Sequence, residues 1–166
     1  MEWRCRYGVI GTALGLLLIS ACSLPKFPLD ATPQLPRDPQ LLGDWRCMNF
    51  DSGKDDTEPF TIASDTDNAR KYVVSWPEGD HTTLTQAYLS RLSLFPRRLV
   101  LNVEVPDDKS WFYVRYALLQ PNVLLVKGVT GDFNSVSSSA EVRKTLKRQG
   151  DKAFEDWMLC VRRVTH

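Results

Sequence analysis

The residues best suited to covalent chemistry in this chain are two cysteines and one histidine. Cys47 and Cys160 lie far apart in the sequence, and His81 follows the turn-like segment PEGD. A thiol beside an imidazole would be a nucleophile for acyl transfer. The competing interpretation is a disulfide between the two thiols and a solvent-facing histidine. It is favoured because both cysteines lie in strand-like runs.

The spacing of the possible ligands argues against a metal site. Zinc needs four ligands, and the two thiols, His81 and His166 have no finger-like spacing. Residues 51–58, DSGKDDTE, gather four carboxylates that could hold calcium, but they lack the order of an EF-hand loop. We interpret that segment as a hydrophilic hairpin loop and expect no metal and no cofactor.

Other functional classes are disfavoured by missing motifs and by charge. The sequence has no G-x-S-x-G nucleophile elbow and no glycine-rich phosphate loop. Its 21 basic and 20 acidic residues give a formal net charge of +1, without the basic excess of a nucleic-acid binder. We therefore expect a protein that is not an enzyme and does not bind nucleic acid.

The first residues have the pattern of an export signal. Arg4 and Arg6 precede an apolar run over residues 9–19. That run is much shorter than the roughly 20 helical residues needed to cross a membrane, and it has the length of a signal-peptide core. The alternatives are an uncleaved anchor or an ordinary signal with a chance cysteine.

The end of this run, Ile19-Ser20-Ala21-Cys22, resembles the lipobox of bacterial lipoproteins. The resemblance implies that residues 1–21 are removed and that Cys22 is acylated and becomes the mature N-terminus, bound to the membrane by its acyl chains. Ser23, in place of an aspartate, implies the outer membrane of the cell envelope, facing the periplasm.

Cleavage before Cys22 would leave Cys47 and Cys160 as the remaining pair of thiols. Exported compartments are oxidising, so a disulfide between them is expected. It would join the start of the folded region to its end. If the thiols were instead free and reactive, the interpretation as an enzyme would gain weight.

Residues 22–40 are predicted to be a tether. Five of the ten prolines lie between Ser23 and Gln40, and proline favours extended polyproline II over helix or sheet. Such a tether would hold a domain clear of the lipid head groups. Packing of this segment against a core is the alternative, supported only by scattered leucines and Phe27.

Residues 41–166 are predicted to form one mainly β domain. In residues 98–105, apolar side chains alternate between two faces, which is typical of a half-buried strand. Ser138 and Glu141 have capping-box spacing, and Gly150 ends a short predicted helix before the last strand. The expected fold is an antiparallel meander closed into a barrel, or alternatively a β-sandwich. Strand-like segments cover residues 70–76, 82–89, 91–95, 98–105, 110–119, 122–129 and 154–164.

Gly43 and Trp45 in LLGDWRC resemble the Gly-x-Trp opening strand of the lipocalin and calycin barrels. The last strand, with Trp-x-x-Cys followed by Arg162 and Arg163, is similar to that of small bacterial lipocalin-like envelope proteins. The resemblance implies a barrel closed by its first and last strands. It also implies that Trp45 packs across the closed end, against Arg162 or Arg163.

The expected function is a membrane-anchored binding or interaction module. Its partner would be an apolar small molecule or another envelope protein. Trp45, Trp76, Trp111 and Trp157 either fill the core or line a cavity for such a ligand. Two further hypotheses are an inhibitor of a periplasmic hydrolase and an enzyme of unrecognised type.

Overall fold

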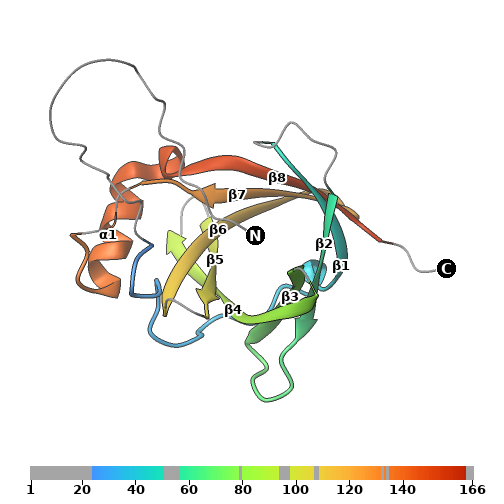
Figure 1. Ribbon diagram of the computed structural model, residues 1–166. Coiled ribbons are helices and arrows are strands. Elements are labelled where there is room, and N and C mark those ends of the chain that lie inside the picture. The colour runs from blue at the N-terminus through green and yellow to red at the C-terminus, as the bar shows by residue number, and fades with distance from the viewer. Residues whose placement is uncertain are drawn as a thin grey trace, which may run out of the picture.

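Eight antiparallel strands form a closed barrel in the computed structural model, which describes residues 24–50, 57–78, 80–93, 98–106, 109–131, 133 and 135–163 (Figure 1). Each strand pairs with the next in sequence, and β8 returns to pair with β1. The predicted meander is confirmed, and the β-sandwich alternative is wrong. The strands are β1 (Gly43–Asn49), β2 (Thr57–Ser64), β3 (Lys71–Glu78), β4 (His81–Ser93), β5 (Arg98–Val105), β6 (Ser110–Gln120), β7 (Val123–Val129) and β8 (Phe154–Arg162).

Alternation along the strands fills the inside of the barrel. In β5, Leu101 and Val103 belong to the interior core, as do Phe112 and Val114 in β6. Successive side chains of a strand point to opposite faces of the sheet, which explains why these apolar residues recur at every second position. The interior core extends around the barrel and also contains Trp45 and the two cysteines.

The outer face of β4 to β6 is buried too, which differs from the expectation of half-buried strands. Val100 and Asn102 of β5 are fully buried, although they point away from the interior. They lie in or beside a second apolar cluster, which also contains Tyr113, Val142 and Leu146. The cover comes from helix α1 (Ser139–Gln149) and from the segment that precedes β1.

The helix begins and ends at the predicted residues. The Ser138 side chain accepts a hydrogen bond from the Glu141 backbone N–H, and Gly150 takes a positive φ of 61° at the C-terminal cap. Val142 and Leu146, four residues apart, are its buried residues and face the barrel wall. In Figure 1, α1 lies outside the barrel, on the side where the described chain begins. The 3₁₀ turn η2 (Gly150–Ala153) then leads into β8.

Residues 24–42 pack along the barrel, so the prediction of an extended tether over residues 22–40 is wrong for the described part. Leu29 and Leu41 are each only 1% exposed. This segment, which we call the strap, runs from beside α1 to the short 3₁₀ helix η1 (Pro39–Leu41) before β1 (Figure 1). The prolines favour an extended chain as expected, but its polar backbone groups find partners on the barrel wall.

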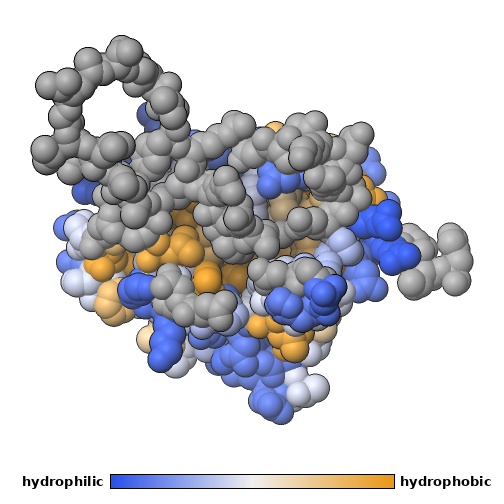
Figure 2. Space-filling model, viewed as in Figure 1, coloured by the Kyte–Doolittle hydropathy of each residue, from blue (hydrophilic) through white to orange (hydrophobic). Residues whose placement is uncertain are grey.

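The surface carries only scattered exposed hydrophobic side chains. Figure 2 shows a hydrophobic area on one face, bordered by hydrophilic edges. No helix in the described part of the chain is long and apolar enough to cross a membrane. Exposed large hydrophobic residues are Met48, Phe50, Leu84, Leu119 and Val161.

Candidate functional site

The barrel interior contains an apolar cavity with a volume of about 80 Å³. Its walls come from strands β2, β3 and β5 to β8, and Leu41 of η1 closes it at one end. The lining is aliphatic and aromatic throughout. The larger side chains that line it are Phe60, Trp76, Phe112, Tyr116, Trp157 and Met158.

Two aromatic rings pack edge to face beside the cavity. The ring centroids of Phe112 and Trp157 are 5.2 Å apart, at an interplanar angle of 68°. Gly128 makes this contact possible, since a Cβ at that position would lie 3.1 Å from the Phe112 Cζ atom. A side chain at Gly128 would therefore push on the ring that borders the cavity.

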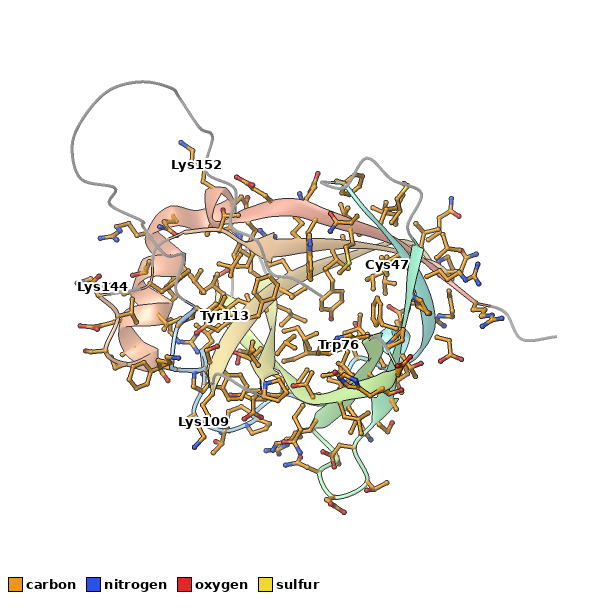
Figure 3. All side chains as sticks on the ribbon, in the orientation of Figure 1. Cys47, Trp76, Lys109, Tyr113, Lys144 and Lys152 are labelled. Carbon is orange, nitrogen blue, oxygen red and sulfur yellow. A yellow bond between two sulfur atoms is a disulfide. The ribbon has the colours of Figure 1, made fainter. Side chains whose placement is uncertain are left out.

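Trp76 supplies an unpaired polar atom at the cavity wall. Its indole Nε1 is buried and has no hydrogen-bond partner among the described residues. An unpaired buried N–H costs about 1–3 kcal/mol, so most such donors in folded proteins are satisfied. The cavity is therefore apolar, and one of its lining residues carries a buried donor without a partner among the described residues. Figure 3 shows Trp76 on the side of the barrel away from α1.

The closed end is built around Trp45. This side chain is 1% exposed, and its Nε1 donates a 2.9 Å hydrogen bond to the Leu41 carbonyl. The Arg162 guanidinium lies over the indole, 4.7 Å from the ring centroid, in cation–π geometry. Arg162 also donates to the Gln40 carbonyl, which ties the last strand to the strap.

Gly43 and Arg163, also predicted to lie at this end, act through their backbone. Gly43 has a φ of 135°, a left-handed conformation that favours glycine, and the Arg162 side chain passes 3.6 Å from where a Cβ would lie. The Arg163 backbone N–H donates a 2.8 Å hydrogen bond to the Asp44 carbonyl, and its side chain is exposed. Arg162, rather than Arg163, is thus the arginine that contacts Trp45.

Cys47 and Cys160 form the predicted disulfide. They lie directly opposite each other in the pairing of β1 with β8, with a sequence separation of 113 residues. Neither sulfur is therefore a free thiol that His81 could activate. His81 is exposed at the start of β4.

Other known proteins offer no guide to this site. No protein-family model, no curated protein and no solved structure matches the chain. What is established is the architecture, a small eight-stranded antiparallel barrel with a disulfide between Cys47 and Cys160. The resemblance to lipocalins rests on the sequence alone, on Gly43, Trp45 and the last strand.

Four tyrosine hydroxyl groups hold the strap against the barrel. Tyr72 accepts a 2.6 Å hydrogen bond from the Asp38 backbone N–H, and Tyr116 donates a 2.9 Å bond to the Asp38 carboxylate. Tyr88 and Tyr113 donate to the strap carbonyls of Asp30 and Phe27. Burial raises the pKa of Tyr72 to about 12 and also raises the pKa values of Tyr88 and Tyr113. All three therefore stay neutral as hydrogen-bonding phenols.

The sequence indicated some of these residues and missed others. Of the four tryptophans among the described residues, Trp76 and Trp157 line the cavity, Trp45 lies at the closed end and Trp111 packs near the outer cluster. The strap contacts were missed, since tyrosines spaced along three strands carry no local signal. Cys22 and most of the acidic loop, residues 51–56, lie outside the described residues.

Proposed function

We propose that this protein is an envelope lipoprotein, anchored through acylated Cys22, whose barrel binds an apolar small molecule that carries one hydrogen-bond acceptor. The observation that carries the ligand proposal is the cavity, with its aliphatic and aromatic lining. Small-molecule sites in proteins are typically concave and mostly apolar, with few polar groups that fix orientation. Trp76 Nε1 is such a polar group here.

The size of the cavity limits the ligand. Its volume of about 80 Å³ is smaller than the roughly 150 Å³ of an engineered cavity that accepts benzene. A ligand of that size or larger must therefore displace a ring at the wall. Trp76 and Trp157 are the candidates, because both are only partly buried. Lining residues such as Leu124 and Val114 are buried and give a firmer wall.

The lipid anchor is supported by the sequence alone. The basic start, the short apolar run and the box ending in Cys22 follow each other in the order and spacing of lipoprotein signals. A disulfide between Cys47 and Cys160 agrees with an oxidising compartment outside the cytoplasm. Labelling cells with a radioactive or clickable fatty acid tests the anchor. A wild-type protein that takes up no label, or a Cys22→Ser variant that takes up as much, would refute it.

Ligand binding is tested on the Cys22→Ser variant, exported with a conventional cleavable signal so that its own acyl chains do not compete. Titration with N-phenyl-1-naphthylamine, a neutral apolar dye, should raise the dye's fluorescence to saturation. Val114→Phe should abolish this signal because it fills the cavity from β6. Val161→Phe, at an exposed position on β8, is the matched control and should bind normally.

Thermal melts of both variants show whether the barrel remains folded. A folded wild-type protein that gives no saturable signal would contradict a ligand-binding barrel. That result would favour a role in contacting another envelope protein, including inhibition of a periplasmic hydrolase. Binding that survives Val114→Phe unchanged would place the dye elsewhere on the molecule.

A further inference from the structure

The strap is attached to the barrel wall from its first residues. Pro25 is buried, and its carbonyl accepts a 2.8 Å hydrogen bond from the Trp111 backbone N–H at the start of β6. Phe27 and Leu29 follow with bonds to Tyr113 and to the Asn102 Oδ1 atom, the latter at 2.8 Å. The described chain is therefore attached to the barrel wall from Pro25 onward, with no free linker after it.

Only two residues, Ser23 and Leu24, lie between Cys22 and this attachment. A fully extended chain covers about 3.3–3.6 Å per residue, so Cys22 is within about 10 Å of Pro25. If Cys22 carries acyl chains, this short link holds the barrel wall beside β6 close to the lipid head groups. The barrel could then not swing freely above the membrane, as a long tether would allow.

We propose that the surface formed by α1 and η2, together with Lys109 just before β6, rests on the head groups of an anionic bilayer. The inference relies on the proposed acylation of Cys22 and adds an orientation to it. We call this surface the basic face. Its exposed cations are Lys109, Lys144, Lys147, Arg148 and Lys152.

The direction of the strands sets which end of the barrel is farther away. In an up-and-down meander, even-numbered strands start at the end opposite to the start of β1. Ser110, the first residue of β6, therefore lies at the end opposite to η1 and Trp45. Pro25, which is bound beside Ser110, is therefore attached at the end of the barrel opposite to η1 and Trp45.

The charge of the basic face agrees with this orientation. Figure 3 places Lys109, Lys144 and Lys152 on the same side of the molecule, the side that carries α1, while Cys47 lies on the other side. Among the described residues the acidic side chains on this face are Glu141 and Asp151. Asp151 is already paired with Arg98 and Arg115. Lysine and arginine side chains near a membrane surface are attracted by anionic lipids, over a distance limited by salt to about 8–10 Å.

The test compares two fluorescent labels on the acylated full-length protein in vesicles. Ala140→Cys places a label on the exposed side of α1, and Asn122→Cys places one on the exposed β6–β7 turn at the closed end. The disulfide remains intact in both variants. The vesicles contain phosphatidylcholine, phosphatidylglycerol and a lipid with a nitroxide on its head group, which quenches nearby fluorophores.

We expect the label at 140 to be quenched several-fold more strongly than the label at 122. Equal quenching, or stronger quenching at 122, would overturn the orientation while leaving the anchor and the ligand site intact. Protein that does not float with the vesicles would overturn the anchor and this inference together. Dye binding to the cavity is measured without vesicles and does not depend on either result.

A second arm tests the charge. The double variant Lys144→Glu with Lys147→Glu should lower quenching at 140 at least twofold, and replacing phosphatidylglycerol by phosphatidylcholine should do the same. Arg70→Glu, in the exposed β2–β3 turn at the closed end, is the matched control and should change nothing. Quenching at 140 that is unaffected by both changes would refute a contact made through the basic face.

Discussion

The two apolar cores of this protein are built in opposite ways. The interior core lies inside the barrel, contains the disulfide and leaves a cavity of about 80 Å³. The outer core lies between strands β4–β6 on one side and α1 and the strap on the other. It contains hydrogen bonds that join Asn102, Tyr88 and Tyr113 to backbone groups of the strap. The interior core is closed where β1 meets β8, by the disulfide and by aromatic contacts. The outer core is closed by polar contacts with the strap, which is mostly irregular in structure.

The contrast shows how a small barrel can keep a cavity and remain stable. Underfilling a core loses packing energy. The outer core supplies additional burial on the other face of the same strands, so that β5 is covered on both sides. The cavity and the additional burial thus lie on opposite faces of one sheet, and substitutions in each core should act differently.

The largest expected effect on stability comes from removing the disulfide that joins β1 to β8. Replacing Cys47 and Cys160 together by alanine should lower the free energy of unfolding by about 4–5 kcal/mol, the chain-entropy value for a loop of this length. Denaturant melts of the oxidised protein and the double variant measure it. A loss below about 1 kcal/mol would mean that strand pairing alone holds β1 to β8.

Trp45→Ala should cost almost as much, about 3–5 kcal/mol, because it empties the closed end of the barrel. Trp45→Phe should be milder, since it keeps an aromatic ring under Arg162 and loses the N–H bond to Leu41. Val161→Ala, on the exposed face of β8, is the control and should change stability by less than about 0.5 kcal/mol. If the alanine variants melt alike, Trp45 does not support the closed end.

Asn102→Ala tests the outer core and should cost about 2–3 kcal/mol, because it leaves the buried Leu29 N–H without an acceptor. Its signature should be local, so amide hydrogen exchange at Leu29 should speed up more than exchange in β7 or β8. Asn122→Ala, in an exposed turn, is the matched control. Uniform acceleration across the barrel would show that the two cores unfold as one unit.

The smallest effect on binding is expected at Trp76. Trp76→Phe removes the unpaired N–H and should weaken binding of acetophenone, which has a carbonyl acceptor, by about fivefold, or about 1 kcal/mol. Binding of ethylbenzene, similar in shape but without the acceptor, should hardly change. Displacement of the naphthylamine dye measures both affinities. Equal losses for the two ligands would mean that Trp76 acts only through its shape.

At neutral pH the strap tyrosines stay protonated, so no pH-dependent change in stability is expected there. Alkaline pH should ionise them and release the strap. Their pKa values are raised in the folded state, to about 12 for Tyr72, so the unfolded chain loses its phenolic protons first. The stability that they contribute is complete below about pH 10, the unfolded value. It is lost as the pH rises toward 12 for Tyr72. Absorbance at the tyrosinate band should therefore rise together with loss of near-ultraviolet circular dichroism, and tyrosines that ionise near pH 10 without unfolding would contradict it.

Much of the fold follows from sequence signals that are local. The strand over residues 98–105, the cap pair Ser138 and Glu141, and the disulfide between Cys47 and Cys160 were each predicted and are confirmed. The packing of the strap was not predicted, because proline content indicates the conformation of the backbone but not the residues that the segment contacts. Those partners, such as Asn102 and Tyr113, are more than seventy residues away, and no local pattern links them to residues 24–42.

The strap also constrains when this protein can become folded. Its bonds connect residues 73 and 86 positions apart, and the ion pair between Asp30 and Arg143 and the disulfide each span 113. Contacts of such long range slow folding, because much of the chain must be ordered before they form. The strap, which lies before all the strands in the sequence, therefore cannot complete its contacts until α1 has formed. Until β8 has paired, the incompletely folded chain exposes apolar strands and open edges, which makes it prone to aggregate.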